Sequence, residues 1–149
     1  MAILDEPIKE PIEVKNYIDG FWVDSEGEVQ DVVNPATGKT IARVPISTRS
    51  EVDEAVSAAR EAFPMWREVP PLARARCMFR LQALLEENFE ELSRIQTMEH
   101  GKTIDESRGE TRRGIENVEV AAGMPSLMMG DYLEDVASGI DEYLIRQPL

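Results

Sequence analysis

The sequence predicts an α/β fold in which two β-hairpins precede three helices and one further strand follows them. Short β-prone runs alternate with turn residues across residues 16–47, and apolar residues recur at helical spacing across residues 48–134. Residues 139–149 alternate in the manner of a strand. Residues 1–15 contain prolines, charges and few apolar residues, so we expect them to form a loosely held arm.

The composition is that of one globular domain, with 149 residues, 42% hydrophobic and 30% charged side chains. The 29 acidic residues outnumber the 16 lysines and arginines, so the formal net charge is −13. Such a surface argues against nucleic acid or an anionic membrane as a partner, since both require a basic patch. Lysine is scarce, as it would be in a protein that works in high salt.

The number of cysteines and the N-terminal sequence help to predict the cellular location of the protein. Cys77 is the single cysteine, so an intrachain disulfide is excluded and a reducing cytosol fits. The first residues lack the charged start and apolar core of a signal peptide, and no apolar run approaches membrane-spanning length. We therefore expect a soluble, cytoplasmic protein.

The two hairpins are indicated by turn chemistry. An Asp19-Gly20 pair divides residues 17–23 into two short β-prone runs, which is the commonest signal of a tight hairpin. The turn at 35–38 separates the longer runs 29–34 and 40–46. These segments predict four short strands.

The first two helices are predicted from caps and prolines. Thr48 and Glu51 form a capping box, so a helix begins there, and Pro64 either closes it or opens a separate turn carrying Trp66. A second helix, expected to be the longest, starts at Pro71 and ends before Gly101, with a possible break near Asn88.

The third helix begins with the capping box of Thr103 and Glu106, and Pro125 ends or kinks it. We expect its apolar positions to be buried; these are Ile104, Ile115, Val118 and Ala122. Residues 131–138 are interpreted as a connector, and the strand of residues 139–147 follows.

Several short segments carry a family likeness through their order and spacing. They are Asn34–Lys39, Glu99–Lys102, Arg113–Glu119, Pro125–Asp131 and Tyr143–Leu149. Together they resemble the aldehyde dehydrogenase superfamily and, within it, the CoA-acylating methylmalonate-semialdehyde dehydrogenases. The resemblance extends from about residue 16 to the last residue.

The resemblance implies that the chain is the N-terminal part of a longer enzyme, incomplete without a downstream dinucleotide-binding sheet. Such enzymes use NAD and CoA to oxidise malonate or methylmalonate semialdehyde to acetyl-CoA or propionyl-CoA. It also implies a homo-oligomer, a dimer or tetramer, in which residues 139–149 form an oligomerisation strand. This segment alone is expected to bind neither cofactor and to be inactive. The rival interpretation is a truncated, non-catalytic helical interaction subunit of the same family.

The residue types that often act in catalysis are expected to have structural roles in this chain. Cys77 falls inside the second predicted helix without a nearby base, and we expect a buried, inert thiol. His100, the single histidine, lies in the last turn of the same predicted helix and is expected to interact with helix carbonyls. We see no G-x-G-x-x-G turn and no metal-ligand cluster, so no catalytic, cofactor-binding or metal residue is assigned.

Arg113 is the candidate substrate-binding residue. The resembled enzymes use an arginine at the matching place to hold the substrate's carboxylate, and a guanidinium suits that task because it grips a carboxylate with two hydrogen bonds. The alternative is a surface arginine paired with Glu110, Glu116 or Asn117 on the same helix. Both interpretations stay open, and Arg112 is expected to form a salt bridge instead.

Overall fold

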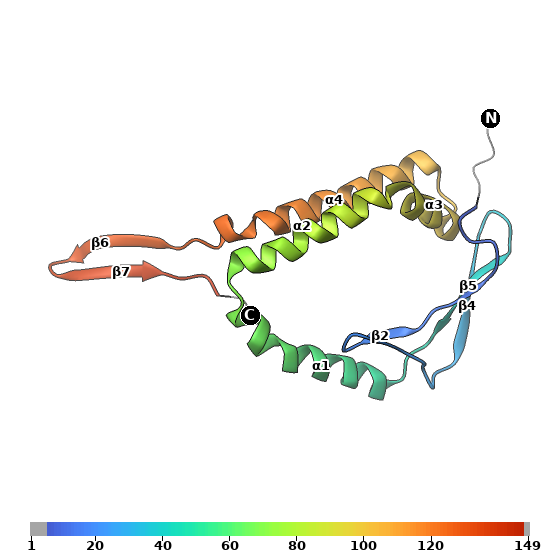
Figure 1. Ribbon diagram of the computed structural model, residues 1–149, viewed down its shortest axis with the longest axis horizontal. Coiled ribbons are helices and arrows are strands. Elements are labelled where there is room, and N and C mark those ends of the chain that lie inside the picture. The colour runs from blue at the N-terminus through green and yellow to red at the C-terminus, as the bar shows by residue number, and fades with distance from the viewer. Residues whose placement is uncertain (1–5, 148–149) are drawn as a thin grey trace.

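The structure is a computed structural model that describes residues 6–147. Over this range the helices are α1 Arg49–Glu68, α2 Pro71–Glu87, α3 Phe89–His100 and α4 Ile104–Leu127. The strands are β1 Ile12–Glu13, β2 Asn16–Ile18, β3 Phe21–Val23, β4 Val29–Val33, β5 Thr40–Pro45, β6 Asp131–Ala137 and β7 Ile140–Leu144. Figure 1 shows α2 and α4 side by side, α1 apart from them beside β2, and the β6–β7 hairpin extending away from the helices.

The two hairpins expected from the turns are confirmed. β2 pairs antiparallel with β3, and the φ angles of Asp19 and Gly20 are both positive, at 50° and 83°, as a two-residue primed turn requires. β4 pairs antiparallel with β5 around the turn that contains Gly38 at φ 71°.

Part of the expected loose arm is held in place. Ile12 and Glu13 form β1, which pairs in parallel with β5. The Glu13 carboxylate also accepts a hydrogen bond from Arg43 at 2.9 Å. Residues 1–5 of the arm lie outside the described residues, as do residues 148 and 149 of the predicted last strand.

The core lies between α2, α3 and α4. Ile115 of α4 is 1% exposed, and Ala122 of the same helix, Ala75 of α2 and Met98 of α3 are also buried. Thr97 and Ser107 share a hydrogen bond of 2.8 Å across the α3–α4 contact. Ile115 and Ala122 are thus buried, as the apolar pattern of the third predicted helix indicates.

The prediction of three helices is wrong, because the described part of the chain forms four. The second predicted helix is divided at Asn88, whose backbone lies at φ −102° and ψ 15°. The Asn88 side chain donates to the Leu84 carbonyl at 2.8 Å, which closes α2 before α3 begins at Phe89. As a consequence α4, with 24 residues, is longer than α2, with 17.

Two prolines interrupt their helices less than expected. α1 continues through Pro64 to Glu68, so Trp66 lies within the helix and not in a separate turn. α4 continues two residues beyond Pro125. Proline removes one helical N–H donor, and an exposed helix tolerates this because water can satisfy the orphaned carbonyl. In α1 that carbonyl belongs to the exposed Arg60.

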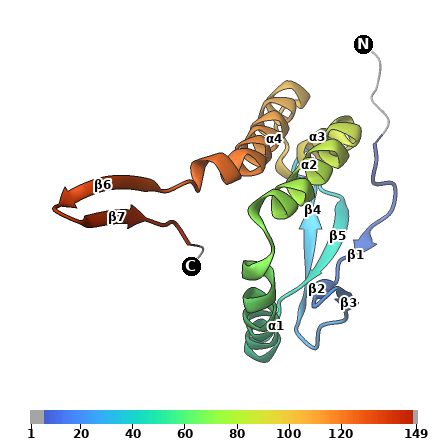
Figure 2. The same cartoon turned by 60° about the vertical axis from the view of Figure 1, so that its left-hand side comes forward.

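Residues 131–138, expected to be a connector, instead form β6, which pairs antiparallel with β7. Asp141 holds the two strands together, because it accepts hydrogen bonds from the Tyr132 hydroxyl and from the Asp135 N–H, each at 3.0 Å. The Tyr132 and Tyr143 rings lie 4.9 Å apart across the hairpin. Figure 2 shows the hairpin reaching away from the rest of the chain, and all its residues are exposed. An oligomerisation role for it stays a prediction.

None of the helices within residues 6–147 has the length and apolar character needed to span a membrane.

Candidate functional site

The candidate site lies along α4, whose start is fixed by local chemistry. The Thr103 hydroxyl accepts a hydrogen bond from the Glu106 N–H, and the Glu106 carboxylate accepts from the Thr103 N–H and hydroxyl. These hydrogen bonds from Thr103 hold the pKa of Glu106 below its ordinary value. The preceding Gly101 has φ 74°, the left-handed conformation that ends α3. Both features were predicted from sequence, and together they set the register of α4.

The side chain of Arg112 contacts Glu86 and Phe89. Its guanidinium donates to both carboxylate oxygens of Glu86 on α2 and lies 4.9 Å from the centroid of the Phe89 ring. The hydrogen bond to Arg112 holds the pKa of Glu86 below its ordinary value. The expected salt bridge of Arg112 is therefore confirmed.

Arg113 has a different environment. Its side chain is exposed and forms no hydrogen bond or ion pair with any of residues 6–147. Glu110 is engaged by Lys102 at 2.6 Å, and the Asn117 amide donates to the backbone carbonyl of Arg113, not to its side chain. A Cβ added to Gly114 would meet nothing within 4 Å in the described part of the chain. The guanidinium of Arg113 is thus available, with open space beside it.

Arg113 is one end of an exposed line of residues that we call the α4 stripe. Its members are spaced by four and three residues, and they are Arg113, Asn117, Val120, Met124 and Leu127. This spacing places them on one face of a helix. Val120 is 61% exposed and Leu127 59%, so the face next to the arginine is apolar and uncovered.

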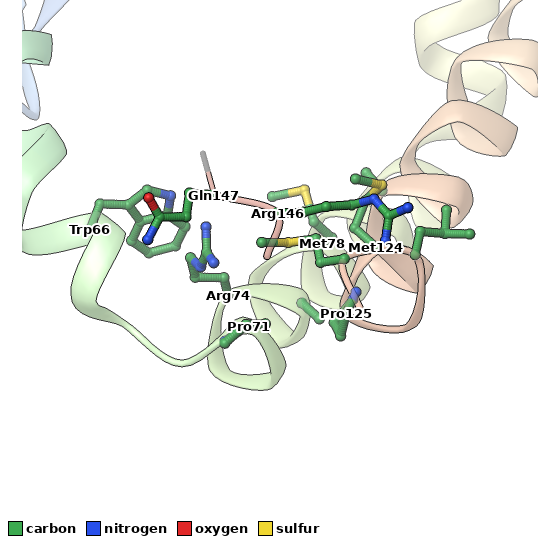
Figure 3. Close-up of a pocket in the computed structure, with 12 residues that line it drawn as sticks. Trp66, Pro71, Arg74, Met78, Met124, Pro125, Arg146 and Gln147 are labelled. Atoms are coloured by element: carbon green, nitrogen blue, oxygen red, sulfur yellow. The ribbon is translucent and has the colours of Figure 1, made fainter. Parts of the chain in front are cut away.

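An apolar cavity of about 450 Å³ lies at the other end of the stripe. It is lined by the end of α1, the start of α2, the end of α4 and the segment after β7, and it is open to solvent (Figure 3). The residues around it are Trp66, Pro71, Arg74, Ala75, Met78, Ala121, Met124, Pro125, Leu127, Met128, Arg146 and Gln147. No sequence pattern predicted this cavity, although the Met-rich run at residues 124–129 contributes to its wall.

Arg74 is the unusual side chain of the cavity wall. Its Nε atom is shielded from solvent and has no hydrogen-bond partner among the described residues. Nearby, the Arg67 guanidinium donates to the Gln147 side chain at 3.2 Å, which joins the segment after β7 to α1. The cavity therefore combines apolar walls with a donor that has no acceptor among residues 6–147.

Cys77 and His100 are not brought together. Cys77 lies on α2 and is half-buried, less shielded than expected; its Sγ accepts a hydrogen bond from Arg80 at 3.1 Å. His100 is the exposed last residue of α3, a separate helix from that of Cys77 because Asn88 divides the two. Their expected inert roles stay predictions.

The described residues show no arrangement that would bind a metal ion. No group of three or more histidine, cysteine, aspartate or glutamate residues within 6–147 is arranged to hold a metal ion. The first turns of α1 and α4 are capped by Glu51 and Glu106 of the chain itself, whereas α2 and α3 begin without a side-chain cap.

Comparison with known proteins defines the class. Residues 22–149 match the aldehyde dehydrogenase family, and the chain belongs to that family. It is similar to malonate-semialdehyde dehydrogenase 2 of Geobacillus kaustophilus, with 54% identity over 137 residues that cover 91% of this chain and 28% of the relative. The malonate-semialdehyde dehydrogenase of Bacillus pumilus is 50% identical over the same coverage.

Solved structures of members of this family are similar to this chain. A methylmalonate-semialdehyde dehydrogenase from Oceanimonas doudoroffii superimposes with a TM-score of 0.86 and 42% identity, over 92% of this chain and 28% of the other. A protein described as a methylmalonate-semialdehyde dehydrogenase from Sinorhizobium meliloti, in complex with NAD, superimposes with a TM-score of 0.87 and 37% identity. The match covers 95% of this chain and 29% of the other. The chain thus spans little more than a quarter of these proteins, in their N-terminal part.

Proposed function

We propose that this chain is the N-terminal segment of an NAD-dependent, CoA-acylating aldehyde dehydrogenase that acts on malonate or methylmalonate semialdehyde. The names of its relatives support the substrate, and the NAD complex of a structural neighbour supports the cofactor. With malonate semialdehyde, NAD⁺ and CoA would give acetyl-CoA, CO₂ and NADH. NAD⁺ would accept the aldehyde hydrogen as hydride, and the proton taken up by the carbon that loses CO₂ would balance the one released by the CoA thiol.

The observation that carries the proposal is the available guanidinium of Arg113. The substrate has a carboxylate near the reacting aldehyde, and a guanidinium binds a carboxylate through two charge-assisted hydrogen bonds. Arg108 and Arg112 of the same helix pair with Glu90 and Glu86, whereas Arg113 has no acidic partner among residues 6–147. Its guanidinium can therefore bind an external carboxylate.

The part of the enzyme beyond this chain would supply the NAD and CoA sites and the nucleophile. The only thiol here, on Cys77, is hydrogen-bonded to Arg80 and lies on α2, away from the α4 stripe. We therefore infer that residues 1–149 alone bind no cofactor and are inactive, and that they bind substrate only as part of the complete site. A cytoplasmic homo-oligomer stays the accompanying prediction.

The second candidate is a non-catalytic interaction subunit of the same family. The exposed apolar faces of α1, α2 and α4 favour it, because such faces bind other proteins. The two candidates differ in whether the segment supports turnover once the rest of the enzyme is present.

A fusion enzyme distinguishes them. Residues 1–149 are joined to the carboxy-terminal remainder of the Geobacillus kaustophilus enzyme, and NADH and acetyl-CoA formation from malonate semialdehyde is measured. We expect CoA-dependent turnover from the fusion and none from residues 1–149 alone. A folded fusion that binds NAD but does not turn over would favour the non-catalytic subunit.

A further inference from the structure

Glu110 is well placed to pair with Arg113. The two residues are three positions apart on α4, and side chains at that spacing are neighbours on a helix surface, with the glutamate preceding its cation in the favourable order. Glu116 is equally near in sequence but follows the arginine, which is the less favourable order. Among residues 6–147, however, Glu110 pairs with Lys102 and not with Arg113.

Lys102 holds Glu110 from the connection between α3 and α4. Its Nζ atom lies 2.6 Å from Oε2 of Glu110, and the hydrogen bond that it donates holds the pKa of Glu110 below its ordinary value. The side-chain amide of Gln96 on α3 donates to the same oxygen. One carboxylate oxygen of Glu110 is therefore bound by a cation and an amide that both come from outside α4.

The surroundings of Lys102 fix its position. Gly101 ends α3 at φ 74° and Thr103 caps α4, so Lys102 lies between a helix end and a helix cap. Its side chain is only 18% exposed, compared with 53% for that of Glu110, and it lines a pocket with Met98. Because the stem of a lysine can pack along other side chains while its ammonium group stays at the surface, Lys102 presents its charge to Glu110 from a defined place.

We propose that Lys102 is a positioning residue for Arg113: it holds Glu110 and so keeps that carboxylate from pairing with the guanidinium, which stays free for the carboxylate of the substrate. This inference rests on the proposed function, in which Arg113 binds the substrate. Lys102 acts through Glu110 and not by a contact with the substrate.

The physical reason is competition between two carboxylates for one guanidinium. Without Lys102, Glu110 would keep only the neutral amide of Gln96, and Arg113 would be the cation within reach on the same face of α4. The other two arginines of α4 are already paired with other glutamates. A substrate carboxylate would then have to displace Glu110. An exposed pair of this kind is weak, but it gains strength where the site is shielded from water.

The test is the kinetics of the fusion enzyme with a carboxylated and an uncharged aldehyde. Lys102→Ala should raise KM for malonate semialdehyde by about three- to tenfold at nearly unchanged kcat, because the change weakens binding. The kinetics with propionaldehyde, which has no carboxylate, should stay the same. Lys102→Arg keeps a cation beside Glu110 and should restore most of the lost binding.

Glu110→Gln distinguishes positioning from a merely structural role of Lys102. This substitution removes the competing charge, so the double variant Lys102→Ala with Glu110→Gln should return KM for malonate semialdehyde to within about twofold of the unchanged fusion. A helix start that had only been loosened by Lys102→Ala would not be repaired in this way. A defect that persists in the double variant, or that affects both aldehydes alike, overturns the proposal.

Arg108→Ala is the matched control. It also removes a cation from a pair between helices near the start of α4, since Arg108 lies 2.9 Å from Glu90, but it leaves Glu110 bound to Lys102. It should not change the preference between the two aldehydes. A selective defect equal to that of Lys102→Ala would show a general effect of lost positive charge and overturn the proposal.

Arg113→Ala separates this proposal from the proposed function. In the Arg113→Ala background, Lys102→Ala should add no selective defect, because the guanidinium for which the carboxylates compete is gone. If Arg113→Ala is selective for the carboxylated aldehyde and Lys102→Ala is not, the substrate contact stands and the positioning by Lys102 is refuted. If Arg113→Ala shows no selectivity, both are refuted.

Discussion

The carboxylate of Glu51 accepts a hydrogen bond from the hydroxyl of Ser25 at 2.9 Å, across 26 residues of chain. The same carboxylate accepts from the N–H of Thr48, which it caps at the start of α1, and from the N–H of Glu26 at 3.0 Å. One side chain thus joins the connection between β3 and β4 to the first helix. The backbone hydrogen bond from Thr48 and then the hydroxyl of Ser25 lower the pKa of Glu51 from 4.5 to about 2.

The first prediction follows from that pKa. A carboxyl whose pKa is lower in the folded than in the unfolded state stabilises the fold at pH values above its unfolded pKa. This stability is lost as the pH falls from about 4.5 towards about 2. Glu51→Gln should lower the free energy of unfolding at neutral pH and weaken its decline over that acid range, as measured by urea unfolding at a series of pH values.

Glu54→Gln is the matched control for this effect. Glu54 lies on the same helix, is exposed and has no hydrogen bond to any of the residues described. The Glu54→Gln substitution should leave the free energy of unfolding at neutral pH, and its decline in acid, close to those of the unchanged chain. Equal effects of the two substitutions would refute the specific role of Glu51.

The second prediction concerns Arg113 in the fusion enzyme. A charge-assisted hydrogen-bonded pair contributes roughly 1.5 to 3 kcal/mol. Because about 1.4 kcal/mol is a factor of ten in rate, Arg113→Ala should lower kcat/KM for methylmalonate semialdehyde by about one to two orders of magnitude. Propionaldehyde carries no carboxylate, so its kcat/KM should change little.

Arg112→Ala provides the comparison. It removes the contact with Glu86 and Phe89 and should destabilise the α2–α4 packing, which slows both substrates alike if it slows either. A defect selective for the carboxylated substrate in Arg112→Ala, with none in Arg113→Ala, would move the substrate contact by one residue. Without selectivity in either variant, the arginines have no role in substrate choice.

The third prediction is that Cys77 is structural. Its side chain is half-buried and accepts a hydrogen bond from Arg80, so Cys77→Ala should cost about 1 kcal/mol or less of stability. Turnover of the fusion enzyme should remain near that of the unchanged protein at a temperature where both are folded. Loss of turnover at unchanged stability would show a chemical role for the thiol.

The fourth prediction is that residues 1–149 alone bind no NAD. The starts of α1 and α4 carry Glu51 and Glu106 of the chain itself, and the net charge of −13 repels a further anion. Isothermal calorimetry should detect no binding at micromolar concentrations, whereas the fusion enzyme should bind. Micromolar affinity of the isolated chain would place the cofactor site within these residues.

Local signals in the sequence determined much of this fold. The capping boxes at Thr48 and Thr103, the left-handed Gly101 and the Asp19-Gly20 turn were all predicted, because each depends on residues within a few positions of one another. The salt bridge of Arg112 and the family resemblance were also readable from the sequence.

Other features were decided only by tertiary structure. The β6–β7 hairpin depends on Asp141 meeting Tyr132 across the strands, and neither strand shows a one-sided apolar pattern that would reveal it. Arg113 is available because Lys102, from outside α4, engages Glu110. The cavity beside Arg74 joins segments from residue 66 to residue 147. A sequence pattern reports neighbours along the chain, and which of several acidic or apolar side chains meet across elements is settled only when those elements pack.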